Sequence, residues 1–332
     1  MKYGHSLSAY VQHFFTERLV KQQNATPNTI ATYRDTFRLL LEYAEEKTGH
    51  APTKLRVEQI NADLIRRFLT NCEGERRNTA RSRNTRLAGI RSFFQYVSRN
   101  EPQLSLHCQK ILAISPKKYT KRNIDYLKED EIQALVDAPD CTSFLGRRDR
   151  TLILLTVQTG LRISEVANLR IKDIRFGTGA HVWCIGKGRK ERATPLRRDS
   201  RKALQNWIDE RGGEPDDPLF ITSRGTALSH DAVQRLVRVH AARASKRCPT
   251  LKKKRVTPHV LRHTAAMQLL QSGVDLTVIA LWLGHESADT TQVYVHADTQ
   301  MKERAMAQTR PVEDGPDRFR PTDELMKFLN SL

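Results

Sequence analysis

The sequence predicts a mainly helical protein with a small antiparallel β-sheet, an α+β fold divided into two domains. Apolar residues recur at steps of three and four through the first hundred positions, two short strand-like runs flank a glycine-containing turn in the middle of the chain, and helical periodicity returns after them. At 332 residues the chain is long enough to bury two cores. We expect a helical domain at 1–114, a basic linker at 115–125, a mixed domain at 126–309 and a tail at 310–332.

Four helices that share one core are expected in the first domain. The first covers about 7–21. The second begins after Thr26, a good N-cap residue, with Pro27 at its first position, and it ends at Gly49. The apolar stripes of the second, third and fourth helices are Ile30, Tyr33, Phe37, Leu40, Leu41 and Ala44; Ile60, Leu64 and Phe68; and Leu87, Ile90, Phe94 and Val97.

The second domain mixes helix and strand. A helical pattern resumes near Glu129, and 150–158 is apolar enough to be buried on most sides. Residues 182–185 and 192–196 are strand-like, and the glycines of 186–191 suit a hairpin turn between them. Further helices are expected after Pro195 and near 232–244, 258–271 and 276–283.

The charge of the chain predicts a polyanionic partner. Lys and Arg number 56 against 37 Asp and Glu, a net charge of +19, and nucleic acid is the commonest polyanion. No apolar run is long enough to span a bilayer or to form a signal peptide, so we expect no membrane partner and a cytoplasmic, nucleoid-associated location. The five cysteines form no CxxC pair, so we expect buried or inert thiols and neither a disulfide framework nor a zinc site.

Three basic runs are candidates for phosphate contact. A solvated helix face normally mixes charges of both signs, whereas acids are almost absent from these runs. The candidate DNA-binding residues are Arg76, Arg77, Arg81, Arg83 and Arg86 around the start of the fourth helix, Lys117, Lys118, Lys121 and Arg122 in the linker, and Lys252, Lys253, Lys254 and Arg255.

Three short segments carry residues that suit phosphate chemistry. Arg162 lies at a turn that enters a helix, with Glu165 one turn on, although such a pair is usually a surface ion pair. Thr257 and Pro258 suit a helix start, which puts His259 and Arg262 on one face near an anion-favouring N-terminus. His263 is close to that face, and spacing alone does not exclude it. Gly284 and the polar residues after it allow a turn through which His285 and Tyr294 converge.

Together the segments TGLRISEV, IGKGRKERATPL, HVLRHTAA and LGHESADTTQVY resemble the catalytic domain of the tyrosine recombinases, the lambda-integrase and Xer family. The resemblance covers nearly the whole chain and is sharp from Thr159 to His296. It implies that the first domain is a SAM-like core-binding domain. The site residues that it implies are Arg162 and Arg262 as phosphate ligands, Tyr294 as nucleophile, Lys187 as general acid, His259 and His285 as completing residues, and Glu165 as an accessory residue that holds Arg162; His263 matches no catalytic position.

The resemblance further implies a site-specific recombinase or integrase that works through a 3′-phosphotyrosyl intermediate, from a mobile element or an Xer-like system. Because the phosphotyrosyl ester conserves the energy of the broken bond, neither a cofactor nor a metal is expected. The expected partners are a double-stranded DNA site and further copies of the chain, as a dimer or tetramer, and the tail at 310–332 is expected to dock on a neighbouring subunit. A second recombinase or accessory protein stays open. The alternatives are a type IB topoisomerase-like enzyme and a non-catalytic DNA-binding relative.

Overall fold

The computed structural model describes residues 6–119, 124–186, 191–284, 291 and 294. The chain divides between Lys121 and Arg122 into two compact units, a point that lies inside the expected linker. Each unit has a core of its own.

The regular elements described in the first unit are all helices, and Ser6 and Arg56 form an isolated β-bridge. Thr26 caps the long second helix, where its Oγ1 accepts a hydrogen bond from the backbone N–H of Thr29 at 3.2 Å, and Gly49 ends that helix in the left-handed region at φ 70°. The elements are α1 (Leu7–His13), the π-helical η1 (Phe14–Gln22), α2 (Pro27–Thr48), the 3₁₀ turns η2 (Pro52–Lys54) and η3 (Val57–Gln59), α3 (Ala62–Gly74), α4 (Ala80–Asn100), η4 (Pro102–Leu104) and α5 (Ser105–Leu112).

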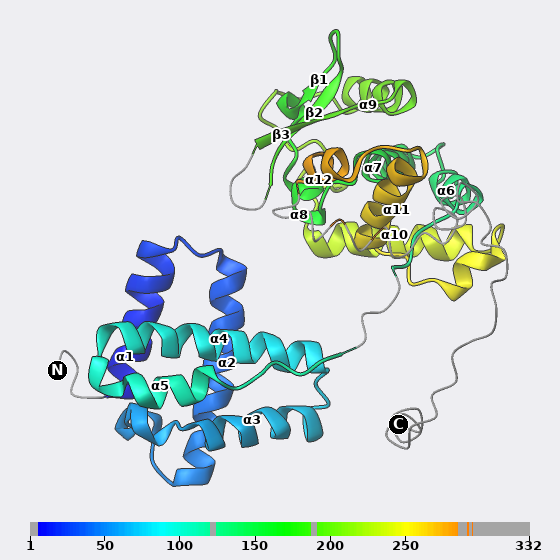
Figure 1. Cartoon of the computed structure of the whole chain (residues 1–332). Helices are drawn as coiled ribbons and strands as arrows, with labels where there is room; N and C mark the ends of the chain where they lie inside the picture. Colours follow the sequence, from blue (N-terminus) through cyan, green and yellow to red (C-terminus); the bar gives the residue numbers. More distant parts are fainter. Residues whose placement is uncertain (1–5, 120–123, 187–190, 285–290, 292–293, 295–332) are drawn as a thin grey trace, which may run out of the picture. The chain divides into compact units, whose positions relative to one another are not determined.

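In this unit α4 and α5 lie side by side, and α1 and α2 cross them (Figure 1). The expected set of four helices was wrong, because α5 is a fifth. Its eight residues have no side-chain cap and bury only Cys108 and Ile111, too short a pattern for periodicity to reveal. Aromatic rings fill the centre of the core, where the ring of Phe93 lies 5.5 Å from that of Phe14 and 5.1 Å from that of Phe37.

The second unit combines helices with a three-stranded antiparallel sheet in the order β1-β2-β3. The expected strands and helices are all present, and the short first strand was not expected. The elements are α6 (Glu129–Val136), α7 (Phe144–Thr159), α8 (Ile163–Asn168), η5 (Ile171–Asp173), β1 (Ile174–Arg175), β2 (His181–Ile185), β3 (Glu191–Pro195), α9 (Arg198–Arg211), α10 (His230–Ala244), η7 (Pro249–Lys253), α11 (Pro258–Gln271) and α12 (Leu276–Leu283).

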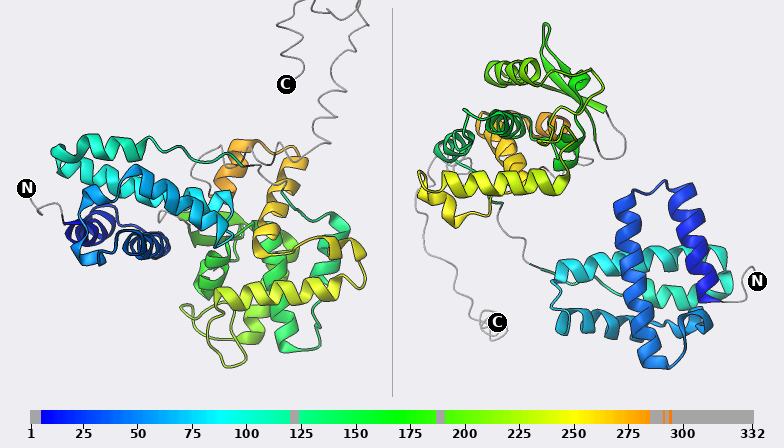
Figure 2. Two further views of the ribbon diagram at one scale, coloured as in Figure 1. Left: turned by 90° about the horizontal axis from the view of Figure 1, so that it is seen from below. Right: turned by 180° about the vertical axis from the view of Figure 1, so that it is seen from behind.

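Helix α7 is the centre of this unit, because α6, α9 and α11 all pack against it. The sheet and α9 lie on one side of the helices and α10 on the other, and the view from behind agrees (Figures 1 and 2). In the sheet Val182 pairs with Thr194 and Cys184 with Arg192. Since Val182, Thr194 and Cys184 are buried, this register directs Arg192 to the inner face of the sheet as well.

None of the five cysteines forms a disulfide. Cys72, Cys108 and Cys184 are buried as expected, whereas Cys141 is exposed and Cys248 partly exposed. Among the described residues, no helix is both long enough and apolar enough to cross a membrane.

The aromatic core of the first unit is open to a direct test. Phe93→Ala should lower the free energy of unfolding of this unit by about 3–5 kcal/mol, because it leaves a cavity between Phe14 and Phe37. All three tryptophans, Trp183, Trp207 and Trp282, belong to the second unit. Urea unfolding followed by far-UV circular dichroism should therefore show the loss, while tryptophan fluorescence stays unchanged. A loss below about 1 kcal/mol would contradict this packing.

Candidate active site

Arg162 stands at the junction of two helices. Helix α7 ends at Gly160, whose φ of 65° lies in the left-handed region, and Arg162 then caps α8 with an extended backbone. The backbone N–H of Arg162 donates to Oε2 of Glu165 at 2.7 Å, and its Nη1 donates to Oε1 of the same carboxylate at 3.0 Å. The expected helix start and the contact between Arg162 and Glu165 are confirmed, although this is no surface pair.

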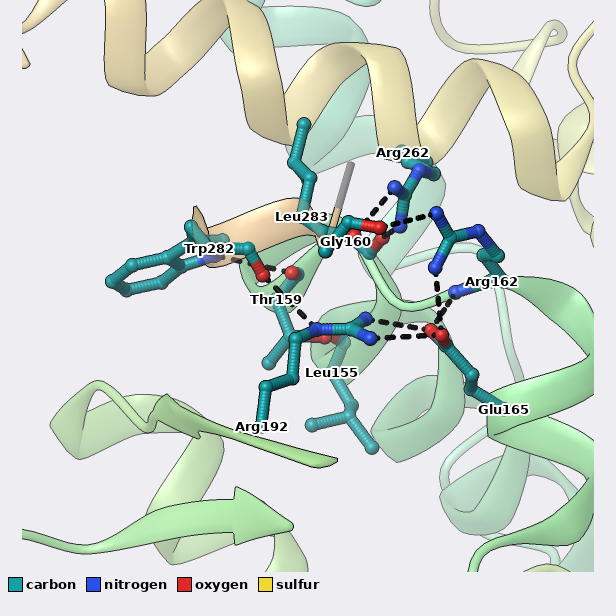
Figure 3. Close-up of polar contacts among 10 residues, drawn as sticks. Leu155, Thr159, Gly160, Arg162, Glu165, Arg192, Arg262, Trp282 and Leu283 are labelled. Carbon is teal, nitrogen blue, oxygen red and sulfur yellow. Dashed lines mark hydrogen bonds and ion pairs between the residues drawn. The ribbon is translucent and has the colours of Figure 1, made fainter. Parts of the chain in front are cut away.

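Glu165 is the buried centre of the arrangement. Its side chain is 3 % exposed, and besides Arg162 it accepts two hydrogen bonds from Arg192 of β3, from Nη1 at 2.9 Å and from Nη2 at 2.7 Å (Figure 3). Burial by itself would raise the pKa of the Glu165 carboxyl, but the hydrogen bonds and charges of Arg192 and Arg162 outweigh burial and lower it. Glu165 is therefore an ionised carboxylate that two arginines share.

Arg262 approaches the same place from α11. Thr257 caps this helix, with its Oγ1 accepting from the backbone N–H of Val260 at 3.3 Å, and Pro258 follows, as expected. Arg262 is only 4 % exposed, and its guanidinium donates to the carbonyl oxygens of Gly160 at 2.7 Å and Leu283 at 2.6 Å. Burial, followed by the like charge of Arg162, lowers the pKa of Arg262 to about 10.

Two glycines supply carbonyl groups that orient these arginines. Gly284 ends α12 at φ 62°, and its carbonyl accepts from Nη2 of Arg162 at 2.7 Å. A Cβ on Gly160 would lie 2.6 Å from Cδ2 of Leu283, and a Cβ on Gly284 would lie 2.9 Å from Nη1 of Arg192. Both positions therefore need glycine for backbone conformation and for space.

Tyr294 is buried beside the arginines, at 2 % exposure, in a small core with Met267 and Leu283. Its hydroxyl lies 3.0 Å from Nδ1 of His263. Burial raises the pKa of the Tyr294 phenol, while the charges of Arg262 and Arg162 act in the opposite direction. In this conformation the phenol is protonated at neutral pH.

The two histidines of α11 differ in their surroundings. His259 is exposed, and its ring centroid lies 4.1 Å from that of His263, which contacts Tyr294. Sequence spacing did not exclude His263 as a site residue, and the family resemblance gave it no catalytic position. In the structure its Nδ1 contacts the Tyr294 hydroxyl. Lys187 and His285 lie outside the described residues.

Arg192 was missed as a site residue. The available signal was the alternation of its strand, since an arginine on the inner face of a sheet needs a buried partner. Its partner, Glu165, lies 27 positions earlier in the chain, and sequence alone does not connect the two.

The predicted DNA-binding residues differ in their surroundings. Some arginines and lysines have an internal partner: Nζ of Lys254 donates to Glu131 at 2.6 Å and to the carbonyl of Tyr126 at 2.7 Å, and both Arg83 and Lys117 lie within 4.0 Å of Glu73. Arg86 is partly buried, and Lys121 and Arg122 lie outside the described residues. Lys117 is exposed although it contacts Glu73, and the other exposed members are Arg76, Arg77, Arg81, Lys118, Lys252, Lys253 and Arg255.

The arrangement is suited to binding an oxyanion. The described bonds of Arg162 use two of the five N–H donors of its guanidinium, and its side chain is 27 % exposed. Two fixed guanidiniums beside a tyrosine hydroxyl can bind a phosphodiester and stabilise the additional charge of nucleophilic attack. The fold and the site thus define a protein of the phosphoryl-transfer class.

Comparisons with known proteins identify the family. The model of the phage integrase family matches residues 125–301, and that of the phage integrase N-terminal SAM-like domain matches 13–101. The Sinorhizobium fredii protein y4rC, named as an integrase/recombinase, is 47% identical over 98% of each chain, and the tyrosine recombinase XerC of Pelobacter propionicus is 33% identical over 87% of this chain and 90% of its own. The chain belongs to the phage integrase family, and it is a tyrosine-type site-specific recombinase.

Solved structures with the same fold include a recombinase and an integrase bound to DNA. XerH bound to a palindromic difH substrate, in a post-cleavage complex, has a TM-score of 0.68 and 24% identity, covering 86% of this chain and 81% of that one. The Tn1549 transposon integrase in complex with transposon right end DNA has a TM-score of 0.67 and 15% identity, covering 90% and 98%. At these identities the likeness concerns the fold.

The buried carboxylate gives a prediction about pH. Because the pKa of the folded-state Glu165 carboxyl is below its usual 4.5, ionised Glu165 stabilises the fold above about pH 4.5, and this stabilisation is lost as the pH falls through the lowered pKa. Glu165→Gln should lower the free energy of unfolding by on the order of 3 kcal/mol at pH 7. This gap in free energy between variant and wild type should narrow as the pH falls below about 4.5. Urea unfolding followed by tryptophan fluorescence measures the gap, and a gap that is constant with pH would contradict the assignment.

Proposed function

We propose that this recombinase cuts DNA by attack of the Tyr294 hydroxyl on a phosphodiester that Arg162 and Arg262 hold. The observation that carries the proposal is that both guanidiniums bond to the carbonyls of Gly160, Leu283 and Gly284, and that their charges act on the nearby Tyr294 phenol. The membership of the family supports the same roles.

In the proposed reaction the phenol oxygen forms a bond to phosphorus and the bond to the 5′-oxygen breaks. The product is a 3′-phosphotyrosyl ester and a free 5′-hydroxyl, and attack by another 5′-hydroxyl reverses the step on a new strand. Arg162 and Arg262 stabilise the charge on the non-bridging oxygens, Lys187 protonates the leaving oxygen, His259 accepts the phenol proton, and His285 completes the site. Lys187 and His285 are assigned by resemblance alone.

In the described conformation the Tyr294 hydroxyl is not open to attack on a phosphodiester. Because the phenol is buried and its hydroxyl lies on His263, it has to leave this contact before it can attack. His263 is thus proposed to hold Tyr294 in the resting conformation, and His259, which is exposed next to it, to act once DNA is bound.

Double-stranded DNA is the proposed substrate, and the chain is proposed to act on it as a dimer or tetramer. The net charge of +19 and the exposed arginines at the start of α4 support the first proposal. The second draws on the likeness to a lambda integrase whose structure is described as a dimer bound to a core site. Residues 1–114 are proposed as the core-binding domain and 126–309 as the catalytic domain. The tail at 310–332, which lies outside the described residues, is proposed to dock on a neighbouring subunit.

Tyr294→Phe tests the nucleophile. On a nicked duplex selected from a random library for binding to the full chain, wild type should form a covalent adduct that resists denaturing electrophoresis. The variant should bind in gel shift with nearly unchanged affinity and form no adduct, because only the attacking oxygen is lost.

A covalent adduct that persists in Tyr294→Phe would overturn the proposal. A plasmid with two copies of the site separates recombination from its closest alternative. Exchanged products support the recombinase, and relaxation without exchange would support a type IB topoisomerase-like activity.

The exposed arginines near the start of α4 should determine how binding depends on salt. Replacing Arg76, Arg77 and Arg81 by alanine should weaken binding and lower the slope of log K against log salt by up to about three, at about 0.9 for each phosphate contact. Arg34, Arg38 and Arg67 are a matched control, since each is exposed and lies within 4.0 Å of an acid. An equal slope in the two triple variants would mean that the α4 arginines are only solvated.

A further inference from the structure

Arg192 donates three hydrogen bonds, two to the carboxylate that holds Arg162 and one to a carbonyl near the end of α12. It is the second residue of β3, and its side chain is 10 % exposed. Two of its nitrogens bind both oxygens of Glu165, and its Nε donates to the carbonyl oxygen of Trp282 at 3.1 Å (Figure 3). Arg192 thus connects the inner face of the sheet to α8 and to the end of α12.

These partners are the ones that fix Arg162. The guanidinium of Arg162 is held by Glu165 on one side and by the carbonyl of Gly284 on the other, two residues after Trp282. Arg192 therefore constrains both anchors of Arg162. Arg192 is more buried than Arg162, so the guanidinium that faces outward is that of Arg162.

The charges point to the same role. A carboxylate that faced Arg162 alone would neutralise it, and the attraction for a phosphate would be weaker. Shared between two guanidiniums, Glu165 leaves the cluster with a net positive charge. A lysine at position 192 could keep the charge but could not bind both carboxylate oxygens and the Trp282 carbonyl in this planar geometry.

We propose that Arg192 is a positioning residue that holds Glu165 and the end of α12 so that Arg162 stays fixed and positively charged toward the scissile phosphate. The inference rests on the proposed function, because it assumes that Arg162 binds this phosphate. It adds a positioning residue on β3, five positions after Lys187 in the sequence.

The test compares three nicked substrates that differ only at the scissile group: the phosphodiester, a methylphosphonate with one negative charge removed, and a 5′-phosphorothiolate whose leaving group needs no proton. Arg192→Lys should cleave the phosphodiester about ten- to hundredfold more slowly than wild type, because a displacement of about 1 Å can cost 10²-fold. On the methylphosphonate the deficit should shrink to a few-fold, since less charge needs stabilising. On the 5′-phosphorothiolate the deficit should persist.

Two reference variants separate the possible failures. The cleavage rate of Arg162→Ala should recover on the methylphosphonate, and that of Lys187→Ala should recover on the 5′-phosphorothiolate. If Arg162→Ala recovers and Arg192→Lys does not, the inference about Arg192 is overturned and the proposed function stands. If Arg162→Ala shows no recovery, the role of Arg162 fails and the inference fails with it. Recovery of Arg192→Lys on the 5′-phosphorothiolate instead would mean that Arg192 acts through Lys187, which also overturns it.

A matched control excludes a general loss of structure. Arg147 binds both oxygens of Glu210 in the same unit, with Nε and Nη2 at 2.6–3.0 Å, outside the described site. Arg147→Lys should cleave like wild type.

A double variant tests the coupling of Arg192 and Glu165. In a Glu165→Gln background Arg192→Lys should lower the cleavage rate little further, because the two residues act together. Full additivity there would overturn the inference, and tryptophan fluorescence verifies that each variant is folded.

Discussion

One buried carboxylate, that of Glu165, determines the geometry of the active site. It is nearly inaccessible to water, and it is balanced by Arg162 from the start of α8 and Arg192 from β3. A buried charge without partners is very costly, so this pairing forces the sheet and the helix to keep a fixed distance. The orientation of Arg162, and through it the place where a phosphate can bind, follows from this constraint.

Arg262 adds a second guanidinium to the site. Arg262 is bound to two backbone carbonyls, and burial with the neighbouring charge of Arg162 lowers its pKa to about 10. An anion placed between the two guanidiniums relieves this cost. The folded protein thus holds its donors in position before the substrate arrives, which is the condition for electrostatic stabilisation of a transition state.

Tyr294, the proposed nucleophile, is buried and not exposed for reaction. Tyr294 packs in a small apolar core, its hydroxyl lies on His263, and burial raises the pKa of the phenol. The structure therefore combines a preformed anion site with a protected tyrosine.

The sequence by itself determined the local structure and the kind of chemistry. Thr26 and Gly49 bound α2, Thr257 begins α11 and Gly284 ends α12. The four motifs predicted Arg162, Arg262 and Tyr294 as site residues. Only the tertiary structure decided which partners these residues have. The role of Arg192 and the contact of His263 with Tyr294 were not predicted, and neither was the bond from Lys254 to Glu131. The physical reason is that caps and periodicity depend on neighbours within one turn, whereas the partner of a buried charge is chosen by packing between segments far apart in the chain.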